Sequence, residues 1–452
     1  VLFRSEGKML SQNSTRHQPN LFYNDLLAQL DLEDPLIKLG EEFPWSMLEK
    51  DFKQYYKSCG RPSKPIRLMV GLLLLKYLEN LSDEQVVLHW KRNPYYQYFC
   101  GFTEFKMCLP CDSSELTKFR NRIGKSGVEK IFKASVILHG ESAYDKEVHI
   151  DTTVQEKNIT YPTDGKLAIK IINRVIKLAK TNCVKQRRTY KKEVKDLRLK
   201  LRNFRHPKRR SEAKRAMKRL RTIAKILIRE AERKLPATIL DKEFDNFTLY
   251  RKVLSQQPKD KNKIYSLHEK EVYCVGKGKD HVQYEYGSKA SIVSTAKKNI
   301  IVGVASHSIN QHDSKTLDGA LASVSKTIGV DPEIASCDRG YRGVTQIGNT
   351  KINLPNKGSK KDTRYQRDKN RTRCRRRAAI EPVIGHLKSD YRLGRNFLKG
   401  VSGDIFNLHM AASAWNLRKW IIEYFCSFIV QTLEKILKQI SVYIFKKIFA
   451  AF

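Results

Sequence analysis

Three acidic residues, Asp151, Asp338 and Glu381, have sequence surroundings in which a carboxylate could bind a cation. Asp151 interrupts the alternating run 147–153, whose apolar residues recur at every second position as in a strand. A carboxylate inside such a strand costs several kcal/mol unless it pairs or binds a cation. Asp338 follows the apolar run 333–337, and side chains at the carboxyl ends of strands face the ligand crevice of α/β sheets. Each has an ordinary alternative, since Asp151 could bond backbone amides or an arginine and Asp338 could start a turn.

Glu381 is flanked by two cations at helical spacing. Cys374, Arg377, Glu381 and Lys388 stand at offsets −7, −4, 0 and +7, which place them within a stripe about 60° wide on one helix face. This requires that Pro382 only kinks the helix of about 373–391. A simple i,i+4 ion pair between Arg377 and Glu381 is the alternative, although it leaves the alignment of Lys388 unexplained. An acid between two cations suits a site that holds a metal and grips phosphates.

Together the three acids predict a metal-dependent phosphoryl-transfer site. Carboxylate oxygens are the ligands that Mg²⁺ prefers, and Mn²⁺ is the alternative ion. Two such ions can activate an attacking oxygen and stabilise a leaving oxygen during in-line displacement. We therefore predict Asp151, Asp338 and Glu381 as ligands of two metal ions that act on a nucleic-acid backbone.

The charge of the chain points to the same substrate class. The 452 residues contain 87 Lys and Arg against 47 Asp and Glu, a net charge of +40. Such a charge favours a polyanion, because each neutralised phosphate releases counterions. A membrane surface explains it less well, since the charge is spread along the chain, and basicity of a ribosome-binding kind is the alternative. Nine scattered cysteines suggest reduced thiols and an intracellular location, and the pair Cys108 and Cys111 lacks the partners of a zinc or redox motif.

The elements that must position the acids can be predicted from periodicity. Residues 21–140 have a helical pattern, with a capping box at Ser82 and Gln85 and a helix over 115–123. At Glu147 the period changes to that of a strand, and a second short strand over 158–161 is expected to form a hairpin that leads into a helix from Lys166. Further strands are expected over 271–275, 284–293, 299–304 and 333–337, with a helix over 316–327. We find no secretory signal and no segment of membrane-spanning length.

Two basic blocks lie outside this pattern. Residues 185–234 contain 22 Lys and Arg against 5 Asp and Glu, with two apolar stripes separated at 206–207, which predicts an inserted helical hairpin. Phosphate contact is favoured for this hairpin over a merely solvated coiled coil. Residues 357–377 contain 11 Lys and Arg against 2 Asp and Glu. Their last members, Arg375 and Arg376, are candidate DNA contacts.

The sequence resembles bacterial insertion-sequence transposases of the DDE class, in the insertion-sequence-five grouping. The likeness rests on Ile150–Val154, on Cys337–Gly343 with Arg342, and on Arg377–Lys388 followed by Tyr391–Asn396. The segments 265–269, 277–279 and 286–287 and the block 112–124 are also similar, so that the resemblance covers about residues 20–420. The third-acid motif reads Y-x2-R-x3-E-x6-K in the family, and Arg377, Glu381 and Lys388 match it. Cys374 replaces the tyrosine, which removes any role that the family gives to that residue.

The resemblance implies an α/β fold with an RNase H-like mixed-sheet core, an all-helical amino-terminal domain and a basic helical insertion. Asp151 would bridge both metals and Asp338 and Glu381 would hold one each. Water would release a 3′-hydroxyl at the element end, and this hydroxyl would attack target DNA. Arg377 and Lys388 would contact terminal phosphates or an extruded base, and Arg342, Arg375 and Arg376 would bind DNA beside them. The implied partners are the terminal inverted repeats, target DNA and further copies of the chain, with no membrane, in the bacterial cytoplasm at the nucleoid.

Four parts of the chain are expected. Residues 1–20 form a leader that is disordered or non-native, and residues 21–140 form a helical DNA-binding or assembly domain. A catalytic domain covers 145–420, with an insertion at about 180–240, and an amphipathic helical tail covers 421–452. Two other functions stay open at this point. One is an RNase H-like nuclease without strand transfer, and the other is a decayed transposase that only binds DNA.

Overall fold

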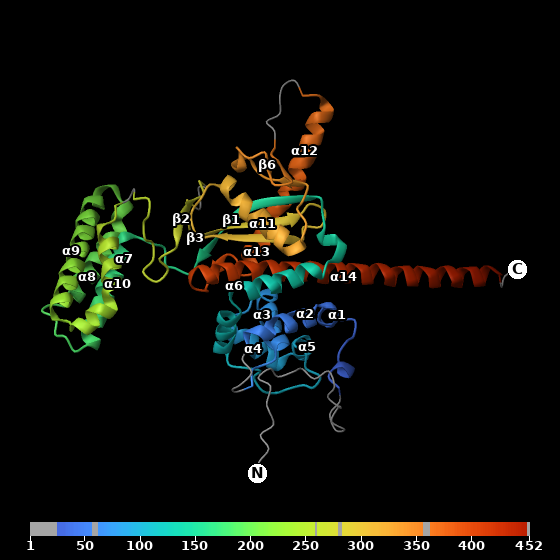
Figure 1. The fold of residues 1–452 in the computed structure, drawn as a ribbon, viewed down its shortest axis with the longest axis horizontal. Coiled ribbons are helices and arrows are strands. Elements are labelled where there is room, and N and C mark those ends of the chain that lie inside the picture. The colour runs from blue at the N-terminus through green and yellow to red at the C-terminus, as the bar shows by residue number, and fades with distance from the viewer. Residues whose placement is uncertain (1–24, 57–61, 258–259, 279–282, 356–361, 450–452) are drawn as a thin grey trace, which may run out of the picture. The chain divides into compact units, whose positions relative to one another are not determined.

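The chain forms two compact units (Figure 1). The computed structural model describes residues 25–56, 62–257, 260–278, 283–355 and 362–449. Residues 1–156 and 289–452 belong to the first unit, and residues 157–288 to the second. The predicted leader at 1–20 and the last residues of the predicted tail lie outside the described residues.

The first unit begins with six helices. They are α1 (Pro35–Glu42), α2 (Trp45–Phe52), α3 (Ile66–Leu78), α4 (Asp83–Arg92), α5 (Pro94–Phe99) and α6 (Ser113–Ile137). Helix α3 is buried on nearly every side, as expected for a helix that is apolar all round. The capping box of α4 is confirmed, because Ser82 and Gln85 each bond the other's backbone. The helix expected over 115–123 is part of the longer α6, which continues past a kink at Gly124, where φ is +55°.

A mixed sheet follows these helices, as predicted. Its strands in the first unit run in the order β3-β1-β5-β7-β6, with β4 also paired to β3 and β8 to β1. They are β1 (Glu147–Lys157), β3 (Tyr284–Thr295), β4 (Ile301–His307), β5 (Ile334–Ser336), β6 (Gln346–Ile347), β7 (Thr350–Asn353) and β8 (Arg395–Asn396). Strands β1, β5 and β7 are mutually parallel, whereas β4 is antiparallel to β3 and β6 to β7.

One hydrophobic core joins the amino-terminal helices to the sheet. Helix α14 (Gly400–Phe449) lies between α6 and α3 on one side and β4 on the other, and α11 (Leu317–Ile328) covers β4 (Figure 1). Buried polar groups cross this core in pairs. The Tyr77 hydroxyl lies 3.0 Å from Asn407 Oδ1, and the Asn416 side chain bonds both backbone groups of Ile301, at 2.9 Å each. These pairs fix the register between α14 and its neighbours, since an unpaired buried amide is costly.

The second unit is mainly a helical bundle. It contains α7 (Asp164–Thr181), α8 (Lys191–Lys200), α9 (Arg210–Lys234) and α10 (Ala237–Ser255), which share a hydrophobic core, and β2 (Tyr273–Gly276), which pairs with residues 284–287 of β3. The unit extends beyond the predicted insertion of about 180–240 at both ends. The strand expected over 158–161 is wrong. Thr160 and Tyr161 bond lysine side chains of α7, at 2.9 and 3.0 Å, and Thr163 then caps that helix.

The helix expected over 373–391 is also divided. Helix α12 (Arg364–Ala378) ends before Ala379, and α13 (Ile380–Ser389) begins after it. Pro382 lies in the first turn of α13, where a proline loses no helical hydrogen bond. Short 3₁₀ turns complete the path at Leu27–Gln29, Lys53–Tyr55, Gly140–Ala143, Leu201–Arg205, Pro207–Arg209, Asp313–Thr316 and Arg339–Tyr341. Among the described residues, no helix combines the length and apolar character needed to cross a bilayer.

Candidate active site

Asp151, within β1, and Asp338, just after β5, lie shortly beyond the last paired residues of these two adjacent parallel strands. Strands β1 and β5 pair in parallel with His149 opposite Ser336. Two residues further along each chain stand Asp151 and Asp338. Because side chains alternate along a strand and neighbouring strands lie about 4.8 Å apart, this register places both carboxylates on one face and close together. The sheet itself therefore brings together two acids that are far apart in the sequence.

The carboxyl group of Asp151 has a raised pKa. This pKa is about 6, raised chiefly by burial and also by the nearby charges of Asp338 and Glu381, while a hydrogen bond from the Thr152 amide and the charge of Arg377 oppose the shift. The Thr152 nitrogen lies 2.7 Å from Asp151 Oδ1. A buried carboxylate with like charges around it gains free energy from a bound cation. The carboxylate of Asp151, its burial and the like charges around it are therefore those expected of a metal ligand.

Asp338 is held by the turn that follows β5. Its Oδ1 accepts a hydrogen bond from the Gly340 amide at 2.8 Å, so that it caps the 3₁₀ turn 339–341 as well as facing Asp151. A side chain at position 340 would bring a Cβ to 2.9 Å from Asp338 Oδ1 and 3.4 Å from Asp313 Oδ2. Gly340 therefore leaves room for two carboxylates that a larger residue would have to displace.

Glu381 lies near the pair but is held by a cation. Arg377 Nη2 of α12 lies 3.3 Å from Glu381 Oε1 of α13, and the Glu381 side chain is 62% exposed. In the described part of the chain, no three His, Cys, Asp or Glu side chains lie close enough to hold a metal ion together. The structure thus brings Asp151 and Asp338 together and leaves Glu381 paired with Arg377, so the three-acid metal site stays a prediction.

The predicted DNA-binding cations differ in their exposure to solvent. Arg377 is 18% exposed, with its Nε enclosed and without a hydrogen-bond partner, and its charge acts on Asp151. Arg375 and Arg376 are exposed on the last turn of α12, and Arg342 is exposed just after the 3₁₀ turn of Asp338. Lys388 lies seven residues beyond Glu381 on α13, which corresponds to about 10 Å along a helix axis. Arg377 thus forms an ion pair with Glu381 and acts on Asp151 through its charge.

Sequence reasoning missed a second polar group beside Asp151. Asp313 Oδ1 accepts a hydrogen bond from the Thr152 hydroxyl at 3.0 Å and from Lys289 Nζ at 2.9 Å. Lys289 also donates to the Gln311 carbonyl at 2.8 Å. The sequence does contain an indication of this group, because Lys289 is a charged residue within an apolar strand and is buried there. A buried charge of this kind needs a partner. Its partner could not be inferred, since Asp313 is 24 residues away in a turn.

Two families match the chain. The family described as "Transposase domain" matches residues 24–122, and the family described as "Transposase DDE domain" matches residues 268–417. The second match includes Asp338, Glu381 and all the candidate cations, whereas Asp151 precedes it. The placement of Asp151 in the site therefore rests on the register of β1 and β5.

A curated relative covers part of the chain. The "Uncharacterized protein ORF8 in nfe locus" of Rhizobium meliloti is 38% identical over 192 residues, which are 41% of this chain and 93% of the relative. No solved structure matches the chain.

Proposed function

The chain belongs to the transposases that have a DDE domain, and from that premise we propose that it cuts DNA at the ends of its insertion sequence and joins those ends to target DNA. The observation that carries the proposal is the placement of Asp151 beside Asp338 on adjacent parallel strands. A transposase must activate an attacking oxygen next to a scissile phosphate, and paired carboxylates are suited to hold the cations that do this.

The sheet order supports an RNase H-like core for this unit. An antiparallel pair, β4 and β3, adjoins β1, and β5 and β7 continue parallel to it. In this arrangement the first acid lies on the central strand β1 and the second lies after its parallel neighbour β5. Helix α13 supplies Glu381 from the chain between β7 and β8, and we assign it as the third acid of the set.

The residues of the chain have distinct tasks in this proposal. Asp151 and Asp338 would hold a divalent cation through their carboxylates, and Glu381 is the third candidate ligand. Bound Mg²⁺ or Mn²⁺, as a pair of ions, would supply activation of the attacking oxygen and stabilisation of the leaving oxygen. Arg377 pairs with Glu381 and would bind a DNA phosphate if Glu381 turned to a cation. The Thr152–Asp313–Lys289 group holds the strand at Asp151.

Basic surfaces would position the DNA around these acids. Arg342, Arg375 and Arg376 are exposed beside the site, and we propose that they bind the phosphates that flank the scissile bond. Lys388, further along α13, would contact the same strand farther from the acids. The helical bundle of the second unit, which contains the block 185–234, is a further candidate phosphate surface. Because an element has two ends, we expect the chain to act as a homo-oligomer in the cytoplasm at the nucleoid.

The test uses a duplex that carries one element end, with Mg²⁺, and a supercoiled plasmid as target. The intact chain is expected to release a 3′-hydroxyl end and to join it to the plasmid, whereas Asp338→Ala should bind the duplex and do neither. Asp318→Ala, an exposed aspartate of α11, is the matched control and should retain both steps. Cutting without joining would assign a nuclease, and equal activity in Asp338→Ala and the intact chain would refute the catalytic assignment.

A further inference from the structure

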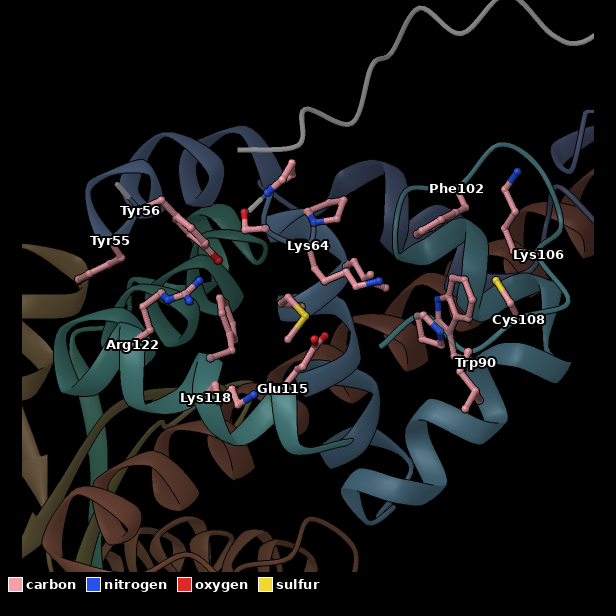
Figure 2. Close-up of a pocket in the computed structure, with 18 residues that line it drawn as sticks. Tyr55, Tyr56, Lys64, Trp90, Phe102, Lys106, Cys108, Glu115, Lys118 and Arg122 are labelled. Carbon is pink, nitrogen blue, oxygen red and sulfur yellow. The ribbon is translucent and has the colours of Figure 1, made fainter. Parts of the chain in front are cut away.

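A large pocket opens among the amino-terminal helices, in a part of the chain that the catalytic account does not use (Figure 2). Its volume is about 850 Å³, and residues of α3, α4, α6 and the segments 55–56, 62–65 and 102–110 line it. This volume is in the range of pockets that enclose a small ligand or one unit of a polymer. The wall combines an apolar floor with cations and aromatic rings, and this chemistry limits what can bind there.

The cations of the pocket are not neutralised from within. Lys64, Lys118 and Arg122 are exposed, and among the described residues none of them lies within ion-pairing distance of a carboxylate. Lys106, in contrast, pairs with Glu104 at 2.6 Å. Glu115 is the acid among the described lining residues, and its Oε2 accepts no hydrogen bond. The pocket therefore has an excess of positive charge and suits an anion.

The aromatic rings lie at both ends of the pocket. Figure 2 shows Tyr56 and Arg122 together at one end and Phe102 with Trp90 at the other. The Arg122 guanidinium carbon lies 4.7 Å from the centre of the Tyr56 ring, and the Phe102 and Trp90 rings pack edge to face at 4.9 Å. An exposed guanidinium already stacked on a ring extends a flat platform, and unpaired bases stack on such platforms.

We propose that this pocket binds an unpaired nucleotide of a DNA strand, with its base against the Arg122–Tyr56 platform and its phosphates at Lys64 and Lys118. A nucleotide matches both the aromatic and the cationic side chains of the pocket, because it carries a flat ring and an anion a short distance apart. A duplex fits less well, since duplexes are read by elements that protrude into a groove and not by a concave wall. This inference rests on the proposed function in one respect, because cutting at element ends would supply the unpaired strand.

Binding is best measured with the full chain carrying Asp338→Ala, in buffer with chelator, so that no cutting occurs. The probes are a fluorescent single-stranded octamer, the same octamer with abasic sites, and a duplex of the same length. Arg122→Ala is expected to weaken binding of the single strand about tenfold, because the base loses the guanidinium on which it stacks. The duplex should lose less than about twofold, and the abasic strand should bind the parent chain as weakly as the single strand binds Arg122→Ala.

The matched control is Lys91→Ala, which removes one exposed lysine of α4 outside the pocket and should change none of these affinities. Thermal unfolding of each variant separates loss of binding from loss of folding, and Lys118→Ala is the second variant if Arg122→Ala unfolds. Equal affinity of Arg122→Ala and the parent, or equal loss for single strand and duplex, would overturn the proposal. Displacement of the octamer by oligoglutamate at equal charge would assign the pocket to an acidic peptide instead. If the pocket binds the single strand but the intact chain never cuts DNA, only the proposed transposase activity fails.

Discussion

Lys289 Nζ lies 2.9 Å from Asp313 Oδ1, and the same oxygen accepts a hydrogen bond from the Thr152 hydroxyl at 3.0 Å. Thr152 in turn donates its amide to Asp151 at 2.7 Å. A lysine on β3 is thereby connected to the central acid on β1 through a residue of the 3₁₀ turn 313–316. The group acts as a brace that keeps Asp151 at the end of the parallel pair.

Removal of the Lys289 charge should damage this brace. In Lys289→Met the Asp313 carboxylate loses its cation while half-buried, and we expect the free energy of unfolding to fall by about 1–3 kcal/mol. DNA cleavage should fall with it, even at temperatures where the chain is folded. Urea unfolding and end cleavage are the measurements. The double variant Lys289→Met with Asp313→Asn should recover stability, and a double variant no more stable than the single one would contradict the pairing.

Asp151→Asn should stabilise the metal-free chain while it abolishes cutting. The pKa of Asp151 is about 6 in the folded chain, above its ordinary value of 3.8, so the folded state binds a proton more tightly than the unfolded state. Its ionisation therefore costs stability as pH rises from about 4 to 6, by about 1–3 kcal/mol at pH 7. Chemical unfolding at pH 4 and pH 7 should show the gain of Asp151→Asn at the higher pH alone. An equal gain at both values would mean that burial of the charge is not its cause.

His307 should contribute to loss of stability in acid. Burial and the charge of Lys289 lower the pKa of its imidazole to about 4. The neutral ring bonds Ser291 at 2.8 Å and accepts from the Gln311 amide nitrogen at 3.0 Å. A lowered folded pKa means that the unfolded chain takes up the proton first, so stability falls as pH drops from about 6.5 to 4. In His307→Gln this part of the pH dependence should flatten, and an unchanged slope would remove His307 from the explanation.

The Ser82 capping box offers a test of the amino-terminal helices. Ser82 Oγ accepts from the Gln85 amide at 3.1 Å, and the Gln85 side chain accepts from the Ser82 amide at 2.9 Å. Ser82→Ala should cost about 1 kcal/mol of unfolding free energy, and Ser82→Thr should retain most of it. Because these helices share one core with the sheet, we expect a single unfolding transition in the first unit for both variants. Separate transitions for helices and sheet would show that they fold independently.

The sequence was most informative where a pattern was local. The period of two around Asp151, the apolar run before Asp338 and the capping box at Ser82 each appear in the structure. The expected strand at 158–161 was wrong because its polar groups bond to α7, a partner that periodicity does not reveal. The Lys289–Asp313 pair was missed for the same reason, since it joins a strand to a turn through space.

The third acid shows the limit of helical spacing as a guide. Arg377, Glu381 and Lys388 were expected to share one continuous helix, but α12 ends at Ala378 and α13 begins at Ile380. The Arg377–Glu381 ion pair that stood as the ordinary alternative is present at 3.3 Å. Whether Glu381 leaves that pair for a cation depends on the free energy of metal binding, which spacing alone does not contain.

Counting bound Mn²⁺ by electron paramagnetic resonance tests most directly whether Asp151, Asp338 and Glu381 bind divalent cations. With an end-bearing duplex present, the intact chain should bind two Mn²⁺ ions tightly, and Asp338→Ala should lose at least one of them while it retains the duplex. Asp318→Ala should match the intact chain. Equal Mn²⁺ binding by Asp338→Ala and the intact chain would contradict the account.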